Sequence, residues 1–237
     1  MSEQFRKNYE EKKSVPKQEK KWRRYAKLTP GFVSTLYMLP KFFQAWPGDY
    51  RPLYNFIDLL IIDEAGQVVP EVGGATLALA KRALVIGDSR QIEPVHNVSE
   101  RLDRANIADQ SLGSDQAERD WFLDASGLSA SAGSLIQLAQ NLCPFRGGLQ
   151  NQGLFLSSHF RCFDDLIAYC NELVYDGALQ PRRGPPGMNM VFPTWGYAHV
   201  PGSSQRNGSK SRCNPLEAEV IADWIKDNLS RIRAFYP

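Results

Sequence analysis

The chain has 237 residues, of which 43% are hydrophobic and 23% are charged, and its formal net charge at pH 7 is +2. This length and composition are typical of a globular protein with one large domain or two small ones, and the small net charge does not by itself indicate binding to nucleic acid or membrane. No apolar run approaches the roughly 18 residues of a transmembrane helix and the polar N-terminus does not resemble a signal peptide, so we expect a cytoplasmic protein without membrane association.

Residues 1–28, MSEQFRKNYEEKKSVPKQEKKWRRYAKL, contain ten Lys or Arg residues against four Glu residues. A charged segment of this kind is typical of a solvated, partly helical lead-in. The alternative is a basic arm that binds nucleic acid. The next segment, TPGFVSTLYMLPKFF, is expected to begin with a short strand-like piece.

A clear strand–helix–strand pattern begins at residue 57. The strand IDLLIID is followed by a helix of small residues around PEVGGATLALA, and then by a second strand, RALVIGD. The run of four aliphatic residues before Asp63, residues 59–62, is typical of a buried parallel strand, and the βαβ order predicts a parallel sheet. The polar segment 97–133 predicts no regular element, whereas SLIQLAQNL predicts a helix.

A second series of elements follows residue 150. GLFLSSHFR predicts a strand and FDDLIAYCNELVY an amphipathic helix that is closed by Gly177. GYAHV predicts another strand, and NPLEAEVIADWIKDNL a helix with Asn214 as its N-cap and proline at its first position. The sequence therefore predicts an α/β fold with a lead-in at 1–28 and two units at 29–150 and 151–237.

Polar side chains follow both strands of the first unit. Asp63, Glu64 and Gln67 come after the first strand, and Asp88 and Gln91 come after the second. In a parallel sheet both groups emerge at the same edge, where ligands bind. Nucleotide hydrolysis needs such a set, with one carboxylate for Mg²⁺, one to activate water, and amides near the terminal phosphate. A solvated Asp–Glu pair without a function is the alternative, and the second polar group at the next strand makes that alternative less favourable.

Five segments occur in the order DEAGQ, GDSRQIEPV, SSHFRC, YCNELVYDGALQP and NPLEAEVIADWI. This series, over residues 29–228, is similar to consecutive motifs of superfamily 1 DNA/RNA helicases, in the branch that contains the nonsense-mediated-decay helicase. The resemblance implies two RecA-like parallel-sheet domains of the P-loop NTPase type. It also implies ATP and Mg²⁺ as cofactors and single-stranded DNA or RNA as a partner bound without sequence preference.

The resemblance also implies roles for individual residues of the first unit. Asp63 resembles the aspartate that holds Mg²⁺ through water, and Glu64 resembles the carboxylate that activates the attacking water. Gln67 and Asp88 match positions near the nucleotide. Gln91 resembles the glutamine that senses the γ-phosphate.

Four further residues match family positions elsewhere in the chain. Arg161 resembles the arginine finger of the second domain, and a surface salt bridge is the alternative for this residue. Glu217 matches an acidic position with a ribose-contacting or structural role. Ser34 and Thr35 lie in TPGFVST, which resembles a segment that contacts the nucleic-acid backbone. A simple strand end is equally compatible with their pattern.

No G-x-x-x-x-G-K-[ST] phosphate loop occurs in the sequence, and GSSQRNGSKS, which has the wrong spacing and lies after DEAGQ, is interpreted as a surface loop. The late helicase motifs are also missing. We therefore expect the back half of one motor domain and the front half of another, with weak or no ATPase activity in isolation. The alternatives are a non-catalytic nucleic-acid-binding or regulatory protein derived from a helicase, and a chain that receives its phosphate loop from a neighbouring chain.

Overall fold

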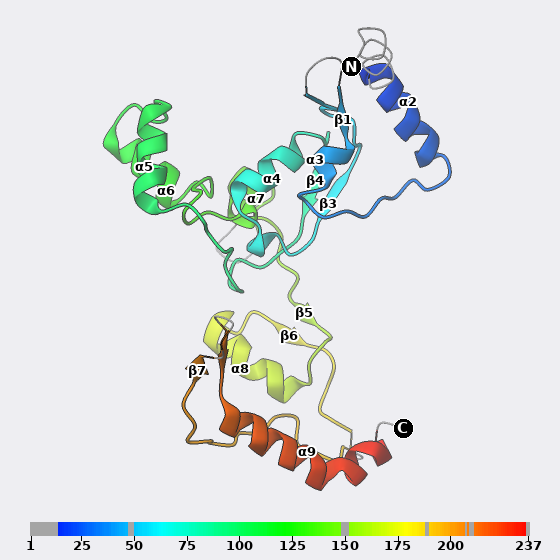
Figure 1. Cartoon of the computed structure of the whole chain (residues 1–237), viewed down its shortest axis with the longest axis vertical. Coiled ribbons are helices and arrows are strands. Elements are labelled where there is room, and N and C mark those ends of the chain that lie inside the picture. The colour runs from blue at the N-terminus through cyan, green and yellow to red at the C-terminus, as the bar shows by residue number, and fades with distance from the viewer. Residues whose placement is uncertain are drawn as a thin grey trace. The chain divides into compact units, whose positions relative to one another are not determined.

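The computed structural model describes residues 14–46, 50–147, 152–187, 190–206, 208 and 211–235. The chain divides into two compact units, Met1–Leu154 and Phe155–Pro237. Each unit combines helices with one pair of parallel strands, so the fold is α/β (Figure 1). None of the described helices is long and apolar enough to cross a membrane.

The first described element of unit 1 is helix α2, Val15–Ala26, which begins with Pro16 in its first turn. Its Trp22 ring stacks on Phe43 with the ring centroids 4.5 Å apart, and the indole Nε1 donates to the carbonyl of Phe42 at 3.2 Å. The described part of the predicted lead-in is thus a helix that packs on its own unit. Residues 29–35, by contrast, are all exposed and form no regular element, so the predicted strand-like piece is wrong.

A βαβ unit forms the centre of unit 1. After α3, Leu39–Phe42, the short strands β1, Gln44–Ala45, and β2, Arg51–Pro52, pair antiparallel. Strand β3, Leu60–Ile62, then pairs parallel with β4, Ala83–Val85, and helix α4, Pro70–Leu77, connects them. The predicted strand–helix–strand order and the parallel pairing are confirmed, with strands shorter than the apolar runs that predict them.

Only one face of this parallel pair is covered. Leu60 and Ile62 of β3 are buried, whereas Ile61 between them is 59% exposed and Leu84 of β4 is 51% exposed. The predicted burial of this strand therefore holds for Leu60 and Ile62 but not for Ile61. The buried core on that face consists of Leu39, Phe43, Ala45, Leu53, Leu60, Ile62, Ala65, Leu79, Leu135 and Ile136.

Helix α7, Leu135–Leu142, begins with a capping box in which Ser134 and Gln137 bind each other's backbone amides. Its first residue, Leu135, is fully buried, and a Cβ at Gly73 of α4 would lie 2.6 Å from the Leu135 side chain. The backbone amide of Leu135 also donates to the carbonyl of Val68 at 2.8 Å. Glycine at position 73 thus lets α4 approach α7 closely.

We expect Leu135→Ala to lower the free energy of unfolding by about 2–5 kcal/mol, because a fully buried leucine leaves a cavity when it is truncated. Urea denaturation followed by circular dichroism measures this change. Leu142→Ala is the matched control, since Leu142 ends the same helix but is 73% exposed. Its expected effect is within about 0.5 kcal/mol. Equal losses for the two variants would contradict the packing described above.

Two helices lie in the polar segment for which no regular element was predicted, so that prediction is wrong. They are α5, Glu100–Asp109, and α6, Gln116–Asp124. Ser99 and Asp115 cap them by accepting backbone N–H bonds, and Arg104 binds both Glu100 and Asp120, at 2.7 and 3.0 Å. Capping and ion pairing therefore stabilise helices whose apolar pattern is weak.

Unit 2 contains a second βαβ arrangement. Strand β5, Ser158–His159, pairs parallel with β6, Gln180–Pro181, and helix α8, Asp164–Val174, lies between them in sequence. Asn171 of α8 fixes the turn before β6, because its side chain accepts from the amide of Leu179 at 2.8 Å and donates to the same residue's carbonyl at 2.9 Å. Gly177 closes the helix with φ of +74°, as predicted.

The C-terminal part of unit 2 differs from prediction in one element. Residues 196–200, GYAHV, form no strand, and residues 196–199 are exposed without a pairing partner among the described residues. A short antiparallel pair forms later, between β7, Gln205–Arg206, and β8, Arg212–Cys213. Helix α9, Pro215–Phe235, follows, and the predicted N-cap Asn214 accepts from the amide of Glu217 at 3.4 Å.

Candidate functional site

The loops that follow β3 and β4 lie side by side. The amide of Ile86 donates to the carbonyl of Ile62 at 2.8 Å, and the amide of Ala65 donates back to the carbonyl of Ile86 at 2.9 Å. The parallel register therefore continues beyond both strands. It brings the DEAGQ segment against the GDSRQ segment at the carboxyl edge of the pair.

Two glycines make this contact possible. A Cβ at Gly66 would lie 2.5 Å from the carbonyl oxygen of Asp88, and a Cβ at Gly87 would lie 2.9 Å from the backbone nitrogens of Ala65 and Gly66. Both distances are below those that real Cβ atoms adopt, and the obstructing atoms are backbone, which cannot rotate away. Each loop thus requires glycine where it touches the other.

Asp63 and Glu64 are both exposed at the end of β3. Glu64 has a left-handed backbone, with φ of 55° and ψ of 37°, and its amide donates to Asp63 Oδ1 at 3.0 Å. A non-glycine residue in this region carries about 1–3 kcal/mol of strain and is often found at functional sites. The amide of Gln67, also exposed, donates to the Glu64 carbonyl at 3.0 Å and closes a single turn of 3₁₀ helix, Ala65–Gln67.

The carboxylates of Asp63 and Glu64 fit an Mg²⁺ ion that is bound together with a nucleotide. Mg²⁺ is usually held by one or two carboxylates while water and phosphate oxygens complete its shell. Asp63 and Glu64 supply two carboxylates, and no group of three or more acidic, His or Cys side chains gathers anywhere in the described ranges. The fit is therefore to a shared ion and not to a site made by protein ligands alone.

Asp88 and Gln91 are held together at the end of β4. Asp88 Oδ1 accepts from the amide of Arg90 at 2.9 Å, and its Oδ2 accepts from Gln91 Nε2 at 3.1 Å. Asp88 is half-buried and Gln91 is exposed. Asp88 therefore fixes the position of the Gln91 amide that the sequence predicts to sense phosphate.

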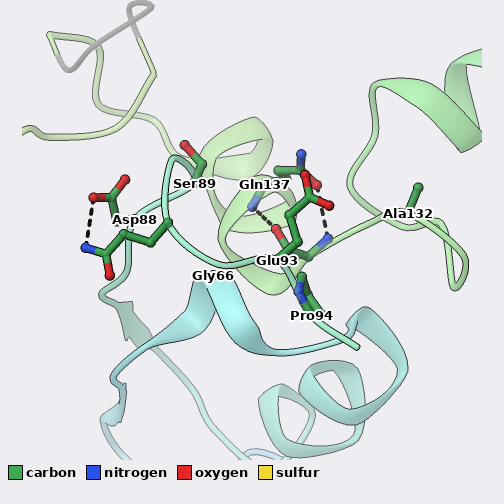
Figure 2. Close-up of a pocket in the computed structure, with 9 residues that line it drawn as sticks. Gly66, Asp88, Ser89, Glu93, Pro94, Ala132 and Gln137 are labelled. Carbon is green, nitrogen blue, oxygen red and sulfur yellow. Dashed lines mark hydrogen bonds between the residues drawn. The ribbon is translucent and has the colours of Figure 1, made fainter. Parts of the chain in front are cut away.

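A pocket of about 30 Å³ lies beside these two residues. A volume of this size holds about two water molecules. Figure 2 shows Asp88 and Ser89 on one side of it and Gln137 and Ala132 on the other. The complete lining is Gly66, Asp88, Ser89, Gln91, Glu93, Pro94, Ala132, Ser134 and Gln137. The pocket suits water or a small ion, and it is too small for a triphosphate.

Sequence reasoning missed the part of this pocket that α7 and the loop before it contribute. Ser134 and Gln137 belong to the capping box of α7, and the S-x-x-Q spacing in the sequence is the signal that identifies such a box. Glu93 lines the pocket from the GDSRQIEPV segment and has no comparable signal. Asp63, Glu64 and Gln67 lie at the same strand edge but do not line the pocket.

Arg161 belongs to unit 2, where it follows β5 and is exposed. Its carbonyl oxygen accepts from Arg183 Nη1 at 2.6 Å, and the Arg183 guanidinium lies 4.4 Å from the centre of the Phe163 ring. His159 Nε2 accepts from the amide of Cys162 at 3.0 Å, so the loop around Arg161 is closed by a structural histidine. The backbone of Arg161 is therefore fixed while its side chain faces solvent.

The remaining predicted residues are Glu217, Ser34 and Thr35. Glu217 is exposed in the first turn of α9 in unit 2. Ser34 and Thr35 are exposed in unit 1, and Ser34 Oγ donates to the carbonyl of Thr35 at 3.1 Å. The Ser34 hydroxyl thus has a local acceptor.

Comparisons with models of protein families and with curated proteins gave no match.

Proposed function

We propose that this chain is part of the motor core of a superfamily 1 DNA/RNA helicase, with two partial RecA-like domains, in which ATP hydrolysis is coupled to movement along a single strand. The observation that carries this proposal is the reciprocal contact of the DEAGQ and GDSRQ segments through Gly66 and Gly87. It joins two carboxylates and a fixed amide at one sheet edge, as nucleotide hydrolysis requires.

Each proposed residue of unit 1 has a separate role in ATP hydrolysis. Asp63 would hold Mg²⁺ through water, and the ion would neutralise charge on the phosphates. Glu64 is the candidate for activating the attacking water, while Gln67 and Gln91 would contact the phosphates. The Asp88–Gln91 hydrogen bond keeps the Gln91 amide in place before a nucleotide arrives.

Arg161 and Glu217 of unit 2 complete the proposed set. A guanidinium fork stabilises charge on a transferring phosphoryl group, and an exposed arginine on a fixed backbone can supply one. Glu217 would contact the ribose or serve a structural role. Single-stranded DNA or RNA is the proposed track, with Ser34 and Thr35 among its contacts.

We expect the 237-residue chain alone to show negligible ATP turnover, with or without single-stranded nucleic acid. The amides and lysine of a phosphate loop normally supply much of the phosphate affinity, and the sequence contains no such loop. A phosphate-release assay with Mg²⁺-ATP measures this. Robust turnover that Glu64→Gln abolishes would show that the phosphates are held by other groups.

The second candidate function is a non-catalytic nucleic-acid-binding or regulatory protein, and the missing loop favours it. An assembly that contains the loop separates the two candidates. We define the loop-containing assembly as this chain together with a phosphate-loop segment, supplied by a neighbouring chain or by in-frame flanking sequence. Nucleic-acid-stimulated ATPase activity in this assembly supports the motor. Its absence in a correctly folded assembly that binds ATP supports the regulatory protein.

A further inference from the structure

Helix α2 has two faces of different character. The side that packs on unit 1 consists of the half-buried residues Val15, Gln18, Glu19, Trp22 and Ala26. Three cations recur on the other side, at spacings of three and four residues that place them in one row along a helix. These residues, all exposed, form what we call the basic face of α2: Lys20, Arg24 and the C-cap residue Lys27.

Aromatic contacts fix the direction in which this face points. Trp22 stacks on Phe43 and meets Phe32 edge-on, with ring centroids 5.4 Å apart. Val15 and Trp22 both pack against the buried core of unit 1. Because the apolar side of α2 is used in this packing, the basic face is held toward solvent by a folded unit.

The charge on this face is not cancelled within the helix. Glu19 is the only acidic residue between positions 15 and 27, and it lies on the packed side. Two further cations of α2 are engaged with aromatic rings, because Arg23 lies 5.1 Å from the centre of Phe56 and Lys21 lies 5.5 Å from that of Trp22. The row spans about 10 Å from Lys20 to Lys27 with three positive charges.

Exposed aromatic rings and hydroxyls lie next to the basic face. Tyr25 of α2 is 47% exposed and Phe32, in the segment that follows, is 44% exposed. The same segment, residues 27–35, is exposed throughout and includes Ser34 and Thr35. A row of cations that follows a backbone, beside rings on which bases can stack, is the arrangement by which proteins bind single strands.

We propose that the basic face of α2 is a binding surface for the phosphate backbone of single-stranded nucleic acid, DNA or RNA, without sequence preference. This inference rests on the proposed function for the role of the bound strand, which would be the track of the motor. The chemistry of the surface itself is independent of nucleotide. It assigns the strand to a preformed helix in addition to the Ser34 and Thr35 hydroxyls.

A membrane surface fits these observations less well. A helix that lies in a membrane inserts its apolar face, and the apolar face of α2 packs against the core of unit 1 instead. Electrostatic attraction to anionic lipid would then be the only term available. The experiment therefore includes anionic vesicles as a competitor whose success would overturn the proposal.

The test is fluorescence anisotropy with labelled single-stranded DNA and RNA oligonucleotides of one sequence, in the absence of ATP, from about 50 to 200 mM salt. Binding of the unaltered chain is expected in the micromolar range. The variant Lys20→Gln, Arg24→Gln, Lys27→Gln removes the basic face, and glutamine preserves helix propensity. Three lost phosphate contacts reduce the slope of log affinity against log salt by about 2.

A matched variant removes the same charge elsewhere. It replaces three exposed residues by glutamine: Arg101, Lys226 and Arg233. This variant is expected to keep most of the slope. An equal decrease of the slope in both variants would mean that binding depends only on net charge and would overturn the proposal. An unchanged slope in the basic-face variant would overturn it as well. Tighter binding to phosphatidylserine vesicles than to either oligonucleotide would identify a membrane surface instead.

A smaller variant guards against misfolding of the threefold one. Lys20→Gln with Arg24→Gln removes two of the three contacts and is expected to lower the slope by about 1.4. Far-ultraviolet circular dichroism confirms that α2 persists in each variant. Because no ATP is present, this binding test is independent of ATP hydrolysis. Loss of binding in these variants together with an inactive loop-containing assembly would contradict the proposed motor and support the basic face. Unchanged binding in these variants together with an active loop-containing assembly would support the motor and contradict the basic face.

Discussion

Replacing Arg161 with alanine is expected to lower ATP turnover by the loop-containing assembly by about 10³-fold or more, the effect typical of an arginine finger. Nucleotide affinity should change far less, because the guanidinium acts on charge that develops during phosphoryl transfer. The backbone at this position is already fixed by the hydrogen bond from Arg183 to the Arg161 carbonyl. The loss would therefore come from the side chain and not from a rearranged loop.

Arg182→Ala is the matched control for this prediction. Arg182 follows β6 in the same unit and is exposed, as Arg161 is. Its Nη2 donates to Gln180 Oε1 at 2.6 Å. We expect its turnover to stay within a few-fold of the unaltered assembly. Arg161→Lys keeps the charge but loses the bidentate fork, so it should recover only part of the activity. Turnover that Arg161→Ala leaves unchanged would reduce this residue to a surface salt bridge.

Glu64→Gln is expected to lower turnover in the same assembly by about 10²–10⁴-fold, the range that a general base contributes. Glutamine has the same shape and the same backbone requirement as glutamate, so the left-handed turn at this position should persist. ATP binding should be retained, since the carboxylate acts on water and not on the nucleotide. Single-turnover kinetics and equilibrium binding of a fluorescent nucleotide separate the two effects.

Glu71→Gln provides the control, because Glu71 is an exposed acid in the first turn of α4, close in sequence to the site but away from the strand tip. Its turnover should match that of the unaltered assembly. Full activity in Glu64→Gln would mean that another group activates the water. Loss of nucleotide binding in Glu64→Gln would instead assign this carboxylate to the metal ion.

The sequence predicts those parts of the fold that local patterns determine. The apolar runs around β3 and β4, the helix from Pro70 and the amphipathic helix closed by Gly177 all carry such patterns. Helices α5 and α6 have a weak apolar pattern, and the ion pair that joins them, Arg104–Asp120, links residues far apart in the sequence, so periodicity does not predict them. The GYAHV strand was predicted from its residues alone, but a strand needs a partner, and pairing is a long-range property that no local pattern contains.

The candidate site shows the same division. Parallel order predicts that Glu64 and Gln91 emerge at one edge, and the loops after β3 and β4 do lie side by side. The hydrogen bond that holds Gln91 to Asp88 is a matter of side-chain conformation, which the motif does not reveal. The contribution of α7 to the pocket was missed because it depends on how Leu135 packs against α4, a contact between segments far apart in the chain.

The left-handed backbone at Glu64 costs stability at a residue that we propose to activate water. Asn and Gly adopt this conformation with less strain than glutamate, so either one would make the turn after β3 more stable. Neither can activate water as a carboxylate does. A more stable turn at this position would therefore lack the carboxylate that we propose to activate water.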